Sequence, residues 1–337
     1  MKKKALVSLT VLMLVLAMAL TGCGGNSNST EPQDQDKNEI KYPERPITMI
    51  IPNSPGGSTD LLGRTVAKGL EKYLGQPVIV QNKPGGSTTI GANELMNSKP
   101  DGYTIGSVNT GMITSSVLKK SPTDYAQELE PIALAAISPQ ILAVKSDSEW
   151  KTLDEFINYA KTNPGKIKIG HTSVGGSTHM ATALFEKTTG IEIEDVTFDG
   201  GSNAVAALLG GHIQAAMLSP VDFKQFMESK QVTALAETGE ERIDDPVYKD
   251  VPTFKELGYD FSEILWQGFG APKNMPEEVK HKLVEAFKKT INDPEIKQAI
   301  IDLGLTPKYS TPEEFKKMWL ETQEKYKDVF TEIGLIK

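Results

Sequence analysis

The sequence predicts an α/β fold made of two doubly wound lobes with a ligand cleft between them. Short apolar runs rich in β-branched residues alternate with segments whose apolar residues recur at helical spacing, and glycine-rich joins separate them. This plan occurs once before about residue 140 and again after it, so we expect two lobes. Open sheets of this kind bind ligands beyond the carboxyl ends of their strands.

The first lobe is expected to contain residues 42–142 and 267–337. Its helix at 60–74 has apolar residues at helical spacing, such as Leu62, Val66 and Leu70, and Gly75 ends it. The predicted order is strand 47–51, helix 60–74, strand 77–81, helix 90–97 and strand 103–107, with C-terminal helices at 276–291, 294–303 and 312–332. Strands separated by helices predict parallel βαβ units covered on both faces.

The second lobe is expected to contain residues 143–266. Pro164 and Gly165 end its first helix, and Gly190 stops a later one. The predicted order is strand 141–144, helix 153–163, strand 166–170, helix 179–189, strand 194–198, helix 204–209 and strand 213–218.

The N-terminus has the pattern of a secretory signal peptide over residues 1–22. Three lysines follow Met1, and a mostly apolar run then extends to Leu20, which is too short to favour a membrane-spanning helix. The Leu-Thr-Gly-Cys sequence that ends at Cys23 resembles the lipobox of bacterial lipoproteins, so we expect a lipid on Cys23; an ordinary signal peptide with an incidental cysteine is the alternative. Residues 23–41 are polar and predict a flexible tether.

Composition excludes several classes of function. Removal of the signal peptide changes the formal charge from -8 to -11, which argues against nucleic acid and against a basic membrane-binding face. Cys23 is the single cysteine, so no thiol is left for a disulfide or a zinc-thiolate site. The four histidines show no His-x-x-x-His spacing, so we expect no cofactor, no metal and no catalytic residue.

Three glycine-rich segments have nearly the same letters: SPGGSTD at 54–60, KPGGSTT at 83–89 and SVGGSTH at 173–179. Each is predicted between a strand and a helix, where glycine lets the backbone approach a ligand and Ser or Thr can cap the helix. The unpaired first-turn N–H groups of a helix suit an anion, so we expect a carboxylate ligand; the alternative is that these are only favourable turns and caps.

Other motifs of nucleotide and ester chemistry are missing. None of the three segments matches a P-loop, a dinucleotide-binding Gly-x-Gly-x-x-Gly or a Gly-x-Ser-x-Gly elbow. Ser177 and His179 are two residues apart at a helix start and would point in different directions.

Several longer motifs occur in the order found in a known family. They are YPERPITMIIPNSPGGSTD at 42–60, LGQPVIVQNKPG at 74–85, PDGYTI at 100–105, AKTNPG at 160–165, VPTFKELG at 251–258 and WQGFGAP at 266–272. This pattern resembles the Bug family, the TctC-like receptors of tripartite tricarboxylate transporters. The resemblance extends from Tyr42 to the C-terminus.

The resemblance implies a Venus-flytrap receptor, not an enzyme, that hands organic acids or other small molecules to a separate membrane permease. We expect a monomer that touches the membrane only through the lipid on Cys23. It would lie at the outer face of the cell membrane, or at a periplasm-facing membrane if the cell has two membranes. The ligand-binding residues that it implies are Ser54, Gly56, Gly57, Ser58, Thr59, Asp60, Ser173, Gly175, Gly176, Ser177, Phe198, Gly200 and Gly201. A sensory module for a membrane partner and an exported enzyme are the alternatives.

Some residues depart from the family pattern or allow two roles. Phe198 stands where family members often have Tyr, and Asn53 where they often have Phe. For Asp60 we favour fixing the first turn through backbone N–H groups over touching the ligand, since a carboxylate repels a carboxylate. His179 is expected at the cleft edge or as a cap, and Trp266 in hinge packing or in the cleft wall.

Overall fold

The computed structural model describes residues 41–172 and 174–337. The predicted signal peptide, the lipidation at Cys23, almost all of the tether and Ser173 lie outside the described residues. Within the described residues, none of the helices combines the length and the apolar character that crossing a membrane requires.

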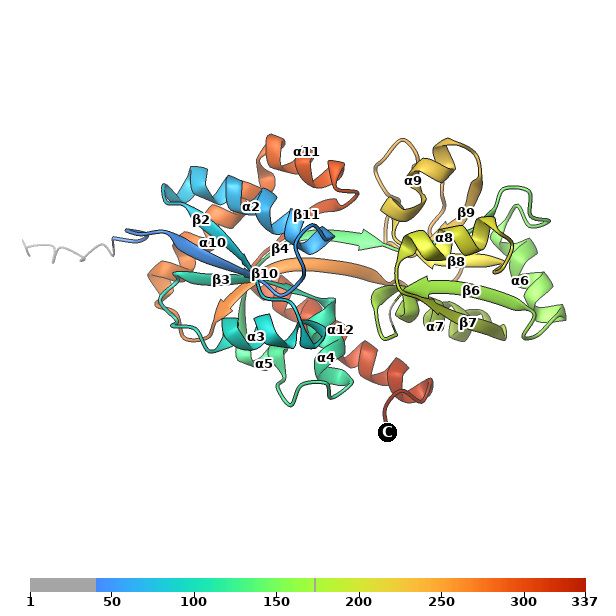
Figure 1. Cartoon of the computed structure of the whole chain (residues 1–337), viewed down its shortest axis with the longest axis horizontal. Helices are drawn as coiled ribbons and strands as arrows, with labels where there is room; N and C mark the ends of the chain where they lie inside the picture. The colour runs from blue at the N-terminus through green and yellow to red at the C-terminus, as the bar shows by residue number, and fades with distance from the viewer. Residues whose placement is uncertain (1–40, 173) are drawn as a thin grey trace, which may run out of the picture. The chain divides into compact units, whose positions relative to one another are not determined.

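The first sheet has six strands in the order β11-β4-β10-β3-β1-β2 (Figure 1). Its strands are β1 (Ile47–Ile51), β2 (Val78–Asn82), β3 (Thr104–Asn109), β4 (Leu129–Pro139), β10 (Ile264–Pro272) and β11 (Thr306–Ser310). The helices of this lobe are α2 (Ser58–Leu74), the 3-10 turn η1 (Gly86–Thr88), α3 (Thr89–Met96), α4 (Thr110–Val117), α5 (Tyr125–Glu128), α10 (Glu277–Asn292), α11 (Pro294–Asp302) and α12 (Pro312–Glu332).

Helices cover both faces of this sheet. Buried residues of α2, α10 and α11, including Leu70, Phe287 and Ile300, form one core against it. Residues of α3, α4, α5 and α12 pack on the opposite face, where Trp266 is fully buried with its ring 5.6 Å from that of Trp319. Trp266, which was expected in hinge packing or in the cleft wall, lies in the core against α12.

The second sheet has five strands in the order β7-β6-β8-β5-β9. Its strands are β5 (Ile141–Lys145), β6 (Ile167–Thr172), β7 (Ile193–Phe198), β8 (Ala215–Leu218) and β9 (Val232–Glu237), and its helices are α6 (Leu153–Thr162), α7 (Ser177–Thr189), α8 (Gly201–Leu209) and α9 (Pro220–Glu228). Helices α6 and α7 cover one face of this sheet, while α8 and α9 cover the other (Figure 1).

The two-lobed α/β class is confirmed, and the predicted parallel βαβ units occur in both sheets, although each sheet also contains antiparallel strands. Strands β1, β2 and β3 are parallel, as are β6, β7 and β8, whereas β10 runs antiparallel to β3 and β4. The reason is that the chain leaves the first sheet through β4 and returns to it through β10, so the returning strand must run the opposite way. The lobe boundaries remain a prediction; the exchange between sheets lies near them, after Pro139 and before Ile264.

The two segments that cross between the sheets are hydrogen-bonded to each other. The Gln140 N–H donates to Thr238 Oγ1 at 2.8 Å, and the Thr238 N–H donates to the Gln140 carbonyl at 2.9 Å. The Thr238 hydroxyl also donates to the Glu263 carbonyl, and all three residues are completely buried. The crossing therefore depends on polar contacts that exclude water.

Replacement of Thr238 by Val should destabilise the protein by about 2–4 kcal/mol, because it leaves the buried Gln140 N–H and the Glu263 carbonyl without the hydroxyl. Urea unfolding measures this loss. The matched control is Thr233→Val, on β9 just before Thr238, where the hydroxyl is only part-buried and bonds Ser146. It should change the free energy of unfolding by less than about 1 kcal/mol. Equal losses in the two variants would contradict the prediction.

Candidate functional site

Six helices start directly after the carboxyl ends of parallel strands. In the first sheet β1, β2 and β3 lead into α2, η1 with α3, and α4; in the second sheet β6, β7 and β8 lead into α7, α8 and α9. Carboxyl ends of parallel strands lie at one edge of a sheet, so each lobe gathers the unpaired N–H groups of several helix starts at that edge.

The turn between β1 and α2 holds six of the predicted site residues. Gly56 has φ +82, which favours glycine, and Gly57 is the N-cap of α2 in extended conformation. The Gly56 N–H donates to Asp60 Oδ2 at 2.8 Å. Ser54, Gly56, Gly57 and Ser58 are exposed, Thr59 is half-buried, and Asp60 is buried.

Asp60 is a structural anchor of this turn, as expected for its favoured role. Its other partners are Arg64, whose Nε lies 3.0 Å from Oδ2, and Asn82, whose Nδ2 donates to Oδ1 at 2.8 Å. Burial alone would raise the pKa of Asp60, but hydrogen bonds from Arg64, the Gly56 N–H and Asn82 lower it below its ordinary value. Both carboxylate oxygens of Asp60 therefore accept hydrogen bonds from the protein, so they are poorly placed to bind a ligand.

The turn between β6 and α7 repeats this geometry in the second lobe. Gly175 has φ +78, Gly176 is the N-cap in extended conformation, and α7 starts at Ser177. The Gly175 N–H donates to His179 Nδ1 at 2.9 Å, so His179 takes the position that Asp60 has in the first lobe. Gly175 is buried, and Gly176 and Ser177 are half-buried. Ser173 lies outside the described residues.

The expectation that Ser or Thr would cap these helices is wrong. The N-caps are Gly57 and Gly176, with no side-chain bond, because each helix starts two residues earlier than expected, at the serine. The Thr178 hydroxyl instead donates to the Thr172 carbonyl at 2.8 Å. The serines thus lie within the first helical turn.

The third glycine-rich segment, residues 83–89, is similar in sequence to the other two but differs in backbone conformation. Gly85, Gly86, Ser87 and Thr88 all have positive φ, and a regular helix begins only at Thr89. The Ser87 carbonyl accepts a hydrogen bond from Ser115 of α4 at 2.5 Å. This segment therefore does not offer the glycine and helix start that the first and second turns share.

Polar side chains that the sequence interpretation did not select lie beside the first turn. Gln267 of β10 donates to Ser58 Oγ at 3.2 Å, and Asn109, the N-cap of α4, donates to Asn53 Oδ1 at 3.3 Å. Gln267 Oε1 is buried without a hydrogen-bond partner among the described residues. An acceptor in that position is available to a donor on a ligand or on water.

The second turn contacts the first lobe. Thr114 Oγ1 of α4 donates to the Gly175 carbonyl at 2.8 Å. A Cβ atom on Gly175 would lie 2.9 Å from Leu118 and 3.0 Å from Thr114, so the contact requires glycine. Helix α4 follows Asn109, which pairs with Gln267 in the sheet. The first and second turns are therefore connected through one helix and one strand.

The segment 198–201 has a different neighbour. Phe198 is half-buried and lies against Gly170, and α8 begins at Gly201 after Gly200. A Cβ atom on Gly201 would lie 2.1 Å from Asp222 Oδ1, so that carboxylate occupies the space at the start of α8. Burial raises the pKa of Asp222, although the Ser219 N–H opposes this. Phe198 pairs with Thr172 in the sheet, so the segment begins beside the strand end that leads into the second turn.

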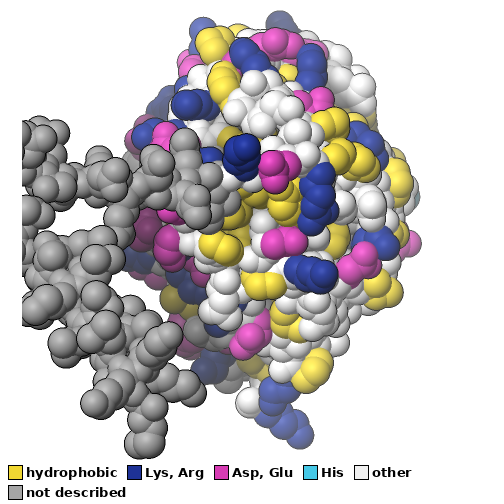
Figure 2. All heavy atoms as spheres, turned by 90° about the vertical axis from the view of Figure 1, so that its left-hand side faces the viewer, with side chains coloured by type: hydrophobic (Ala, Val, Ile, Leu, Met, Phe, Trp, Pro, Cys, Tyr) yellow, Lys and Arg dark blue, Asp and Glu magenta, His cyan; other side chains and the backbone are white. Residues whose placement is uncertain are grey.

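The described residues of the first and second turns include no lysine or arginine. Arg64, the nearest cation along the first turn, is bound to Asp60. On the face of the molecule shown in Figure 2, basic and acidic side chains are interspersed rather than gathered into a patch of one sign. Anion binding here would therefore rely on N–H and hydroxyl groups.

One cavity of about 180 Å³ lies elsewhere, between the start of α9 and the turn that joins α11 to β11. Its lining includes Val221, Tyr248, Ile301 and Gly304, and none of the predicted site residues.

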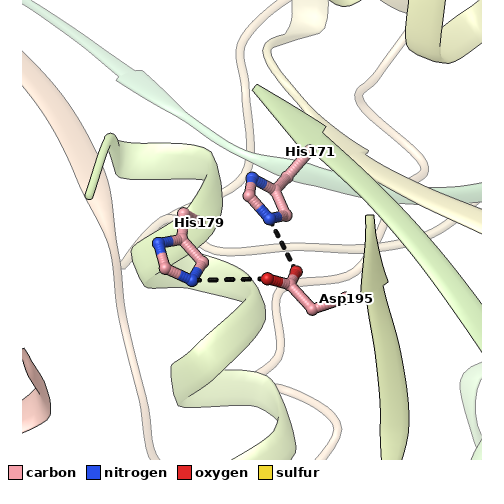
Figure 3. A group of neighbouring side chains, drawn as sticks. All are labelled: His171, His179 and Asp195. Atoms are coloured by element: carbon pink, nitrogen blue, oxygen red, sulfur yellow. Dashed lines mark ion pairs between the residues drawn. The ribbon is translucent and has the colours of Figure 1, made fainter. Parts of the chain in front are cut away.

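His171, His179 and Asp195 form a cluster beneath the second turn (Figure 3). Asp195 Oδ1 lies 2.6 Å from His171 Nε2, and its Oδ2 lies 3.5 Å from His179 Nε2. A metal-bound histidine normally donates its other ring N–H to an acceptor, whereas Nδ1 of His179 faces the Gly175 N–H donor. The two rings are also stacked, 4.6 Å apart and tilted by 14°. This geometry does not suit a metal ion held by both histidines.

Comparison with known proteins identifies the family. The model of the tripartite tricarboxylate transporter family receptor matches residues 62–335. The chain belongs to this receptor family. The protein BugT of Bordetella pertussis is 30% identical to the receptor over 297 residues, which cover 87% of this chain and 90% of BugT.

Solved structures support the same assignment. A TctC solute-binding protein from Polaromonas, determined without ligand, superimposes on the receptor with a TM-score of 0.80 at 31% identity, over 86% of this chain and 99% of that one. An R. palustris protein solved with adipate has a TM-score of 0.72 at 25% identity, over 87% of this chain and 98% of that one. MatC from Rhodopseudomonas palustris, solved with malate, has a TM-score of 0.68 at 26% identity, over 86% of this chain and 99% of that one.

Replacement of Asp60 by Asn should lower the free energy of unfolding by about 1–3 kcal/mol at neutral pH, because an amide offers one acceptor oxygen to three converging donors. Since the pKa of Asp60 is lowered on folding, its contribution is complete above the ordinary value of 3.8 and is lost as pH falls below it. Urea unfolding measures the free energy of unfolding near pH 7 and below pH 3.8. The decrease between the two pH values should be smaller in the variant than in the parent. Asp199→Asn, which removes an exposed carboxylate, is the control and should leave both quantities unchanged.

Proposed function

We propose that this receptor captures a small carboxylate between its lobes and delivers it to a tripartite tricarboxylate-type membrane permease. The observation that carries the proposal is the matched pair of turns at Gly56 and Gly175, which have the same backbone geometry and occur in different lobes. The adipate and malate bound by the two similar R. palustris proteins support an organic acid as the ligand.

The ligand-binding residues that we propose in the two turns are Ser54, Gly56, Gly57, Ser58 and Thr59 in the first, and Ser173, Gly175, Gly176 and Ser177 in the second. Each helix start offers N–H groups that have no helical partner, together with a serine hydroxyl. A hydrogen bond to a charged group contributes about 1.5–3 kcal/mol, so three or four of them support micromolar affinity without a lysine or arginine. Asp60 acts by positioning the first turn.

Segment 198–201 is proposed to contact a part of the ligand other than its bound carboxylate. The Asp222 carboxylate lies against Gly201 and would repel a second negative charge. Phe198 offers an apolar ring, and the backbone of Gly200 and Gly201 offers polar groups. This arrangement favours an apolar or hydroxyl-bearing portion of the ligand near α8.

We also propose that the receptor is exported, anchored by a lipid on Cys23 and not an enzyme. Cys23→Ala should abolish incorporation of radiolabelled palmitate and move the full chain from the membrane fraction to the soluble extracytoplasmic fraction. Ser27→Ala, in the same tether, should leave both unchanged. Continued membrane attachment of Cys23→Ala would contradict lipid anchoring.

Titration calorimetry with adipate, malate, succinate and citrate tests the ligand class. We expect micromolar binding of at least one acid and its recovery unchanged after incubation, as for a receptor. Gly56→Ala should weaken that binding about tenfold or more, because alanine resists φ +82 and the first turn must shift, although no atom lies within 4 Å of the new Cβ.

Gly75→Ala is the matched control for this experiment. Gly75 also has a positive φ, +69, and open space around it, but it caps the C-terminus of α2 at the far end of that helix. It should lower stability to a similar extent and leave the affinity unchanged. Equal affinities in the two variants, or no binding of any acid, would overturn the proposed function.

A further inference from the structure

The second turn is held by a side chain that titrates, whereas the first turn is held by one that remains ionised. We infer that His179 is a positioning residue of the second turn, that only its neutral ring can hold the turn, and that protonation of this ring releases the turn and the ligand. Release of the ligand rests on the proposed function. The role of His179 in holding the second turn rests only on its hydrogen bond to the Gly175 N–H.

The tautomer of His179 follows from its neighbours. Nδ1 accepts the Gly175 N–H at 2.9 Å, so the ring proton of neutral His179 is on Nε2. Nε2 points to Asp195 Oδ2, an acceptor, at 3.5 Å (Figure 3). One side of the ring thus holds the binding turn, and the other side is oriented by Asp195.

His171 completes the arrangement from the strand next to Asp195. Its Nε2 lies 2.6 Å from Asp195 Oδ1, its Nδ1 lies 3.2 Å from the Thr172 carbonyl, and its ring is fully buried. Since β6 and β7 are parallel with His171 opposite Thr197, Asp195 and His171 lie on the same face of the sheet. Asp195 therefore contacts both rings, one through each oxygen.

The charged groups around His179 are few. Strand β6 contributes His171 and β7 contributes Asp195; from the first lobe, α4 and α12 contribute the uncharged Leu118, Thr114 and Phe330 beside Gly175. On α7 itself, Glu186 interacts with Asp195, and Lys187 pairs with Glu332 of α12. Burial and then His171 lower the pKa of His179, while Asp195 opposes this, so the neutral ring is favoured at neutral pH.

Protonation of His179 would place a second N–H opposite the Gly175 N–H. Two donors cannot share the bond, so the turn must move away from the ring. Because the pKa of His179 is lowered, its contribution is complete above the ordinary value of 6.5 and is lost as pH falls below it. Asp60, whose pKa is lowered from 3.8, remains ionised throughout this window and keeps the first turn in place.

The test is nuclear magnetic resonance of the full chain, labelled with 15N at histidine and glycine and free of ligand, from about pH 8 to about pH 5. At the high end His179 should show the Nε2–H tautomer. Below pH 6.5 the Gly175 amide resonance should shift with the same midpoint as the His179 ring nitrogens. A Gly175 amide that stays in place while His179 titrates would overturn the inference.

His179→Asn separates this effect from general acid sensitivity, because its δ oxygen can accept the Gly175 N–H as Asp60 Oδ2 does in the first turn and does not titrate. Its Gly175 resonance should not respond to pH, whereas the control His281→Asn, on the exposed surface of α10, should behave as the parent. Parent-like pH dependence in His179→Asn would contradict the inference.

Asp195→Asn provides a second variant should His179→Asn fail to fold. Loss of the carboxylate that raises the pKa of His179 should move the His179 midpoint to lower pH, and the Gly175 amide should follow it. With adipate as the probe, the affinity ratio of His179→Asn to parent should rise about tenfold between pH 7.5 and pH 5.5. If adipate does not bind, the acid that binds in the calorimetry replaces it as the probe. Failure of all four acids would count against the proposed ligand class, while the ligand-free resonances would still decide the role of His179.

Discussion

The backbone N–H groups at the starts of α2 and α7 have no partners inside their helices, and the candidate site depends on how each lobe satisfies them. In both lobes a glycine with positive φ turns its N–H back to a side chain four residues later, Asp60 in one case and His179 in the other. That internal bond fixes the path of the turn. The N–H groups that follow it at the helix start remain available, which is why a turn of this shape suits an anion.

The side chain that accepts the glycine N–H differs between the two lobes. Asp60 is a carboxylate surrounded by donors, Arg64 and Asn82 among them, and its pKa is lowered below the ordinary value of 3.8. His179 is a ring with an acceptor side and a donor side, and it depends on Asp195 to keep that orientation. A ligand that needs both turns is therefore limited by the turn with the weaker anchor, the one in the second lobe.

Much of the fold follows from local sequence signals, and the remainder depends on contacts between distant segments. Gly75 and Gly190 end α2 and α7 as predicted, because each adopts the left-handed conformation that stops a helix. Strands β4 and β10 were not predicted, since Pro131 and the glycines around Phe269 interrupt any regular alternation. The pairing of His171 with Asp195 depends on the register of β6 and β7, which spacing along the chain does not reveal. Ligand-binding residues were predicted in only two of the three similar glycine segments, and the third differs in shape because Ser87 and Thr88 also take positive φ.

Gly175 is the point at which these contacts converge. Its carbonyl accepts a bond from Thr114 of the first lobe, and its N–H donates to His179 of the second. The crossing segments are bound together through Thr238, whose hydroxyl and backbone both bond Gln140. Separation of the lobes at the second turn must break the bond of Thr114 to Gly175, while protonation of His179 breaks the bond on the other side of the same residue. Separation of the lobes at this point and the charge of one histidine would therefore act on a single peptide segment, and a change in either would alter the geometry that the other requires.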